Sequence, residues 1–66
     1  MNKSTYVAQP LVVAPAQAAE MAGIGRTKLY EAIVSGELPS FKMGTRRLIR
    51  VTALNEWLAS FETPPS

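Results

Sequence analysis

The sequence predicts a small, mainly α-helical fold with three helices and a two-stranded antiparallel β-hairpin. A turn at Gly23-Ile24-Gly25 separates two short helical segments, and a second glycine turn at Gly44 separates two short segments that read as strands. Near the end of the chain, the amphipathic spacing i, i+3, i+4, i+7 predicts a third helix through Leu54, Trp57, Leu58 and Phe61. These observations define the fold class.

The chain of 66 residues has room for one domain with a small core. Residues 1–10 have no periodicity and few large apolar side chains, and we expect a flexible N-terminal arm over residues 1–12. At its end, residues 11–13 are expected to run extended along one edge of the core. Residues 13–61 form the predicted domain. Residues 62–66 contain two prolines and are expected to form a disordered tail.

The first helix is predicted to begin at Pro15, because proline at the first helical position loses no hydrogen bond. Ala14 is then the N-cap, although it offers no side-chain acceptor. Small apolar residues and Met21 make up its apolar face, and Gly23 ends the helix. Ile24 lies between two glycines and is expected to insert into the core.

The second helix is predicted over residues 26–35, with Gly25 as N-cap and Gly36 as C-terminal cap. Leu29 and Ile33 are spaced i, i+4 and face the core. The opposite side carries Thr27 and Glu31, and the flanks carry Lys28, Tyr30 and Val34.

The hairpin is predicted from strands at residues 40–43 and 47–51, joined by a turn at residues 44–46. Phe41 and Met43 are expected on one face of the first strand. Thr52 is the predicted N-cap of the third helix, which is expected over residues 53–61. A helix-turn-helix followed by a hairpin is the arrangement of a winged helix-turn-helix, the fold that we expect.

Positive charge is concentrated in the middle of the chain. The whole chain has a net charge of +2, but six of its seven cations lie between residues 26 and 50. Only Glu31 and Glu37 oppose them in that stretch, which leaves a local net charge of +4. A cluster of this kind is typical of a protein with a polyanionic partner, although a solvated cationic surface has the same composition.

Several classes of function are disfavoured by composition. The chain has no cysteine and no histidine, so it lacks thiolate ligands, imidazole ligands and the commonest general base. Its five carboxylates form no catalytic motif, and we expect no enzymatic activity, no cofactor, no metal site and no catalytic residues. No apolar run approaches the roughly 20 residues of a membrane span. We expect a cytoplasmic, nucleoid-associated protein of a bacterial or phage-infected cell, without a membrane partner.

The elements and the charge together favour binding to double-stranded DNA. In a helix-turn-helix, the N-terminal residues of the second helix point toward base edges in the major groove. Its positive pole and free N–H groups suit phosphate oxygens. A hairpin tip with arginines can approach the minor groove, whose negative potential attracts them. The candidate DNA-binding residues are Arg26, Thr27, Lys28, Tyr30, Glu31, Lys42, Thr45, Arg46 and Arg47.

Each candidate also has a structural interpretation. Lys28 and the hairpin arginines are also consistent with solvated surface charge. Tyr30 flanks the apolar face of its helix, so its ring is equally compatible with a place in the core. Glu31 is consistent either with a contact to cytosine or with an ordinary surface acid that repels phosphate.

The stretch AAEMAGIGRTKLYEAIVSGELPSFKMGTRRLIRVTALNEWL resembles the excisionase-type helix-turn-helix domain, which is related to the winged helices of MerR-type regulators. The resemblance implies a second helix in the major groove and a wing on the minor groove. By position, it implies recognition residues at Thr27, Tyr30 and Glu31, and wing contacts at residues 45–47. Gly25 departs from the serine or threonine usual at that N-cap, and Glu31 departs from a frequent arginine.

Members of this family have two kinds of role. Some are excisionases, recombination directionality factors that bend DNA and assist an integrase. Others are small transcriptional regulators of phage or mobile-element genes. The resemblance therefore implies double-stranded DNA, an integrase and neighbouring copies of the same chain on DNA as partners. Because the sequence shows no dimerisation helix after Phe61, we expect a monomer in solution. A protein-interaction module that does not bind DNA is the alternative from another class.

Overall fold

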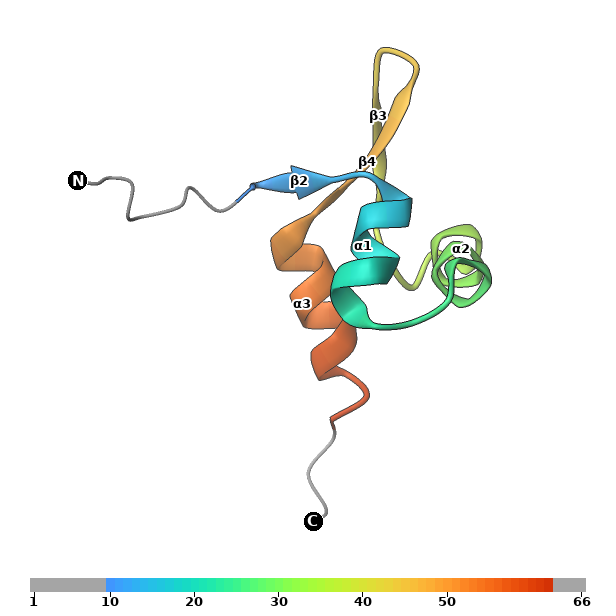
Figure 1. Ribbon diagram of the computed structural model, residues 1–66, viewed down its shortest axis with the longest axis vertical. Helices are drawn as coiled ribbons and strands as arrows, with labels where there is room; N and C mark the ends of the chain where they lie inside the picture. The colour runs from blue at the N-terminus through green and yellow to red at the C-terminus, as the bar shows by residue number, and fades with distance from the viewer. Residues whose placement is uncertain (1–9, 63–66) are drawn as a thin grey trace, which may run out of the picture.

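The computed structural model describes residues 10–62. The predicted arm up to residue 9 and the tail from residue 63 therefore lie outside the described residues. The elements in chain order are β2 (Val12–Val13), α1 (Pro15–Ala22), α2 (Arg26–Ser35), β3 (Phe41–Met43), β4 (Arg46–Arg50) and α3 (Val51–Ala59) (Figure 1). The three helices and the hairpin confirm the predicted fold class, a mainly helical winged helix-turn-helix.

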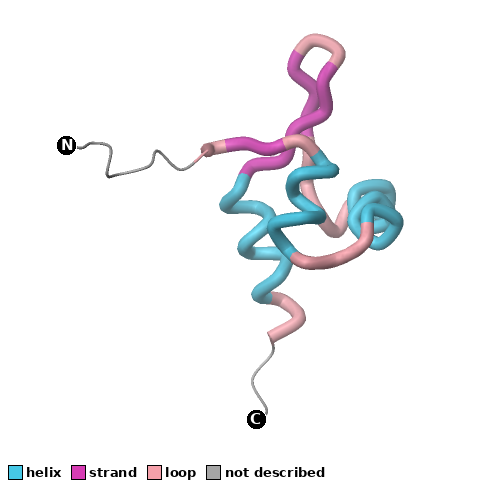
Figure 2. The backbone as a smooth tube through the Cα atoms, viewed as in Figure 1, coloured by secondary structure: helices cyan, strands magenta, loops and turns pink. Residues whose placement is uncertain are grey.

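The strands form one antiparallel sheet in the order β2-β4-β3 (Figure 2). In the hairpin, Phe41 is the partner of Leu48, and on the other edge of β4, Val13 is the partner of Ile49. The extended segment expected near residues 11–13 is confirmed as β2, which adds a third strand to the predicted two-stranded hairpin. Pairing on both edges anchors the base of the wing, because the strand that carries the wing is also part of the core.

The turn between the first two helices has the predicted form. Pro15 is the first residue of α1, and Gly23 ends it with a φ of 73°. The N–H of Gly23 donates to the carbonyl of Glu20 (3.1 Å), and the N–H of Ile24 donates to that of Ala19 (3.0 Å). This is a Schellman motif, which requires a left-handed residue and so favours glycine. Ile24 packs against the core, as predicted.

The core is formed by one contiguous cluster from all three helices and two strands. Its members are Val13, Ala18, Ala19, Leu29, Ala32, Leu38, Ile49, Leu54 and Trp57. The sequence pattern did not single out Leu38, which follows α2 in an irregular segment and is fully buried. Its N–H donates to the carbonyl of Ala32 at 3.1 Å, and this bond turns the chain back under α2. The anchored Leu38 thus links the second helix to the hairpin.

The predicted start and end of the third helix are wrong. α3 begins at Val51, directly after β4, with Arg50 in the N-cap position and no side-chain cap. The N–H of Val51 donates to the carbonyl of Leu11 at 3.0 Å. A free helix N-terminus needs acceptors for its first N–H groups. Because the segment before β2 supplies one, the helix starts without the predicted cap at Thr52.

The end of α3 changes the role of Phe61. The helix stops at Ala59, and the N–H of Phe61 donates to the carbonyl of Leu58 at 3.0 Å in a tighter turn. Phe61 is therefore 67% exposed, although the spacing predicted a core position. Its ring meets Trp57 edge to face, with 5.2 Å between ring centroids. Met21, predicted on the apolar face of α1, is also exposed.

The turn of the hairpin is shorter than predicted. Met43 and Arg46 are partners in the ladder, so only Gly44 and Thr45 form the loop. Gly44 has a φ of 65°, and no other residue type in the described chain has a positive φ. A two-residue loop with positive φ only at its first position is the type II′ pattern, which calls for glycine there. Arg46 consequently belongs to β4 rather than to the turn.

Candidate nucleic-acid interface

The N-terminus of α2 is open to an anion. Gly25 is the N-cap, with φ −74° and ψ 155°, and it has no side chain to bond the first N–H groups. The first turn contains no acidic residue. The N–H groups of the first turn and the positive pole of the helix are therefore available to a phosphate oxygen. The helix lies at the side of the molecule, next to α1 (Figure 1).

The outward face of α2 carries apolar side chains as well as polar ones. Leu29 and Ala32 turn inward and are buried. On the opposite side, Thr27, Tyr30 and Val34 are exposed, together with parts of Arg26, Glu31 and Ser35, and line a shallow hollow of about 540 Å³. Tyr30 is 45% exposed, so its ring belongs to this face rather than to the core.

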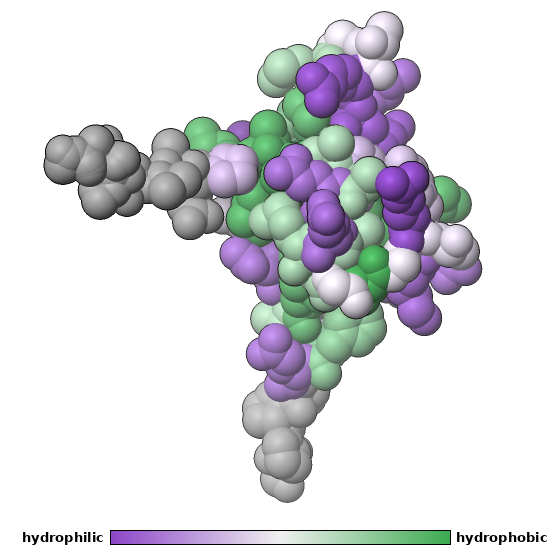
Figure 3. All heavy atoms as spheres, viewed as in Figure 1, coloured by the Kyte–Doolittle hydropathy of each residue, from purple (hydrophilic) through white to green (hydrophobic). Residues whose placement is uncertain are grey.

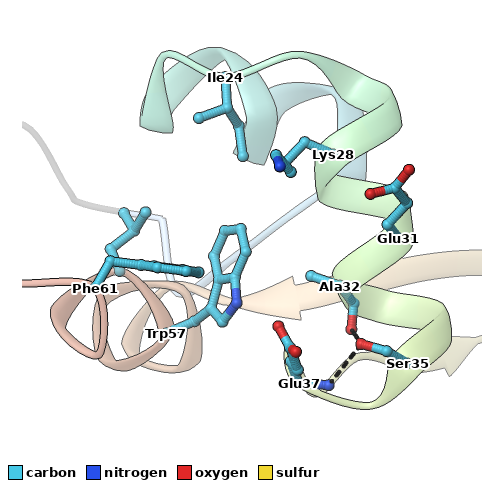
Figure 4. Close-up of a pocket in the computed structure, with 9 residues that line it drawn as sticks. Ile24, Lys28, Glu31, Ala32, Ser35, Glu37, Trp57 and Phe61 are labelled. Atoms are coloured by element: carbon cyan, nitrogen blue, oxygen red, sulfur yellow. Dashed lines mark hydrogen bonds between the residues drawn. The ribbon is translucent and has the colours of Figure 1, made fainter.

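Lys28 lies on a different side of α2. It lines the groove between α2 and α3, together with Ile24, Trp57 and Phe61 (Figure 4). Glu31 lines both this groove and the outward hollow, so it stands at the edge between them. Thr27 and Tyr30 therefore share the outward surface of α2, and Glu31 lies at the margin of that surface. Lys28 lies beside this surface, on the side of the groove.

The wing presents cations on both of its faces. Lys42 and Arg47 are cross-strand partners, so their side chains lie on the same face of the hairpin. The Nη1 of Arg47 donates to the Oγ of Ser40 at 2.8 Å, which orients the guanidinium. Arg46 is the neighbour of Arg47 in β4 and therefore points to the opposite face. Each face of the wing therefore carries positive charge that can contact a negatively charged partner.

This charge is not neutralised within the protein. Like charges directly opposite each other in a ladder destabilise a hairpin, and Lys42 faces Arg47 in this way. Within residues 10–62, none of the candidate cations on α2 or the wing is paired with a carboxylate. Hydrophilic side chains gather over the wing and over α2 (Figure 3). An unpaired cationic surface of this kind fits a polyanionic partner.

All nine candidate DNA-binding residues are exposed, in two groups. The α2 group contains Arg26, Thr27, Lys28, Tyr30 and Glu31, and the wing group contains Lys42, Thr45, Arg46 and Arg47. Val34 on α2 and Ser40 beside the wing also belong to these groups, although neither was among the predicted site residues. The i+7 spacing from Thr27 indicates the position of Val34, and the alternation from Lys42 places Ser40 on the face of Arg47.

Residues 10–62 contain no group of three or more acidic, histidine or cysteine side chains that is able to hold a metal ion. In the same range, no helix has the length and apolar character needed to cross a membrane.

Comparison with known proteins supports the assignment of this chain to the helix-turn-helix proteins. The profile of a helix-turn-helix domain family matches residues 14–61. The chain belongs to this family. Helix-turn-helix domains bind DNA through their second helix, and DNA binding is the class of function that this membership gives.

The comparison also found a related protein in another organism. The chain is 42% identical over 43 residues to a probable excisionase of Saccharopolyspora erythraea, which supports an excisionase-type domain. The aligned stretch is 65% of this chain and 44% of the relative, so the chain matches less than half of that protein's length. No solved structure gave a significant match.

Proposed function

We propose that this protein is a sequence-specific double-stranded DNA-binding protein that acts as an excisionase, a recombination directionality factor that bends DNA and assists an integrase. In this proposal, α2 occupies the major groove and the hairpin follows the adjacent minor groove. In this proposal, the candidate residues on α2 contact bases and nearby phosphates, and those on the wing contact the phosphate backbone of the DNA.

The observation that carries the proposal is a wing whose cations have no carboxylate partner among the described residues, together with an uncapped N-terminus of α2. Lys42 and Arg47 are held side by side at a cost to the hairpin, with no acid to offset them. Phosphate groups on two neighbouring strands of a duplex would offset that repulsion. A protein partner would have to present acidic groups at the same place to offset the repulsion. The similarity to a probable excisionase favours the recombination role over transcriptional regulation.

The experiment that tests the proposal is a selection from random duplex DNA at near-physiological salt, followed by gel phasing on the recovered sites. A short motif recovered as closely spaced direct repeats, with a bend at each, is the expected result. Integrase from the same element is then added to the bent complex, and a supershift is expected.

The alternatives give different results. A single operator-like motif without bending would favour a transcriptional regulator. The absence of any enrichment would contradict sequence-specific binding and would direct attention to a protein partner.

A further inference from the structure

Val34 is the most exposed large apolar side chain of the described residues, at 86%, and it lies on α2. It does not belong to the core-facing side of the helix. At 100° per residue, Val34 lies about 140° around the helix from the buried Leu29 and within about 20° of Thr27. It therefore lies on the outermost line of the helix, two turns after Thr27.

The surroundings of Val34 form a surface with a distinct chemistry. Tyr30 and Thr27 line the same hollow, and their ring and methyl group continue the apolar character of Val34. Arg26 marks one end of this hollow and Glu31 lies at its margin, and the cations of the wing are exposed as well. An apolar strip with a cation at one end complements a partner that presents apolar groups beside anions.

The major groove of DNA has this distribution of chemistry. Phosphates line both of its edges, and the thymine 5-methyl group is the apolar group that a base presents on its floor. We infer that Val34 is a specificity-determining residue, which contacts a thymine methyl group from the C-terminal half of α2. This inference rests on the proposed DNA-binding function. It adds that α2 lies along the groove, because Thr27 and Val34 are about 10 Å apart along the helix axis, roughly three base-pair steps.

The contact between Val34 and a thymine methyl group can be tested by removing that one methyl group from the DNA. In the duplex recovered by selection, each thymine is replaced in turn by deoxyuridine, which lacks only the 5-methyl group. Dissociation constants are measured for the unmodified protein and for Val34→Ala. At one position, deoxyuridine is expected to weaken binding of the unmodified protein by about fourfold, the factor for one buried methyl group. Val34→Ala is expected to be insensitive to deoxyuridine at that position.

Leu11→Ala is the matched control. Leu11 is also a strongly exposed aliphatic residue, at 78%, but it lies next to β2 and away from α2. This variant is expected to keep the affinity and the deoxyuridine pattern of the unmodified protein. Because Val34 is exposed and alanine is the better helix former, Val34→Ala is expected to keep the circular dichroism spectrum and the Tm.

Different results would overturn the role of Val34 and the proposed DNA-binding function on which that role rests. If Val34→Ala keeps the full deoxyuridine sensitivity at every thymine, or if the selected site contains no thymine, the role of Val34 is overturned while DNA binding stands. If neither selection nor titration with mixed duplex detects salt-dependent binding, the proposed function fails, and the inference fails with it.

Discussion

Gly25 leaves the N-terminus of α2 without a side-chain cap, although other residue types would fit at this position. Its backbone has extended N-cap angles, which any residue can adopt, and a Cβ there would have no atom within 4 Å. A serine would therefore fit and would bond the first N–H groups of α2. The glycine keeps those groups free at the end of the helix where we propose that a phosphate binds.

A pair of substitutions at Gly25 separates stability from DNA affinity. Gly25→Ser is expected to raise the free energy of unfolding by about 0.5 to 1 kcal/mol, through a new cap and a less flexible unfolded chain. Gly25→Asp is expected to stabilise the helix as well, since the carboxylate favours the positive pole. It should weaken DNA binding at least tenfold, because that carboxylate occupies the anion site. Thermal melts and binding titrations measure both effects.

The matched comparison is between the two variants themselves. Serine and aspartate both cap the helix, but only aspartate adds charge. Equal DNA affinity for Gly25→Ser and Gly25→Asp would contradict a phosphate contact at the start of α2.

Trp57 contributes the largest side chain of the core and contains an unsatisfied donor. It is 8% exposed, and its Nε1–H has no hydrogen-bond partner among the described residues. A buried donor without a partner costs about 1 to 3 kcal/mol. The burial of the indole outweighs this cost, because removal of a core tryptophan typically costs about 3 to 5 kcal/mol.

Substitutions at Trp57 are expected to reveal both contributions. Trp57→Ala should remove most of the stability of a domain of this size, for which about 3 to 10 kcal/mol is usual. Trp57→Phe keeps an aromatic ring and removes the unsatisfied N–H, so its loss should be within about 1.5 kcal/mol. Urea denaturation followed by circular dichroism measures the change. A phenylalanine variant as unstable as the alanine variant would show that the N–H is not a significant cost.

The wing, as an element, is built for contact rather than for its own stability. Its ladder places Lys42 opposite Arg47, and its tip is a two-residue turn that projects beyond the helices (Figure 2). The base of the wing is secured by Leu48 and Ile49, which are buried. The hairpin tolerates the repulsion between Lys42 and Arg47 near its tip because buried residues anchor it at its base.

Reversing one charge of the pair is expected to stabilise the hairpin and to impair binding. Lys42→Glu replaces a repulsive cross-strand pair by an attractive one, which is worth a few tenths of a kcal/mol at an exposed position. The same change places a carboxylate where we propose a phosphate contact, so DNA affinity should fall at least tenfold. The Tm and the dissociation constant are measured on the same preparation.

Lys42→Gln is the control for this change, because it removes the charge without adding the opposite one. Its Tm and its affinity should both fall between those of the other two proteins. If Lys42→Glu binds DNA as well as the original protein, the wing does not contact the duplex through this face.

At the scale of the whole molecule, the salt dependence of binding measures how many cations meet phosphate. Each neutralised phosphate contributes about 0.9 to the slope of log K against log salt concentration. Arg46→Ala and Arg47→Ala are each expected to lower the magnitude of the slope by about 0.9, with a similar loss of affinity for every duplex sequence. Titrations over several salt concentrations give the slope.

Arg50 offers a matched control for these arginines. It belongs to the same strand and is also exposed, but it lies at the opposite end of β4, where it pairs with Val12. Arg50→Ala should leave the slope unchanged. If all three variants lower the slope equally, the charge acts through the general field of the protein and not through contacts of the wing.

Local signals were sufficient for the helix-turn-helix unit. Pro15, Gly23 and Gly36 define helix ends through backbone conformations that these residue types adopt within a few residues of sequence. The same applies to the exposure of the candidate DNA-binding residues, because helical periodicity separates the core face of α2 from its outer face. Charge clustering, also a property of the chain itself, indicated a polyanionic partner.

Long-range contacts decided the features that the sequence did not predict correctly. α3 starts at Val51 because a carbonyl from the other end of the domain, at Leu11, accepts its N–H. Leu38 is buried because the segment after α2 folds under it, and no periodic pattern marks an irregular segment. The strand register pairs Arg46 with Met43, which places Arg46 in β4 rather than in the turn. These features depend on which segments meet in space, and local backbone preference carries no information about that.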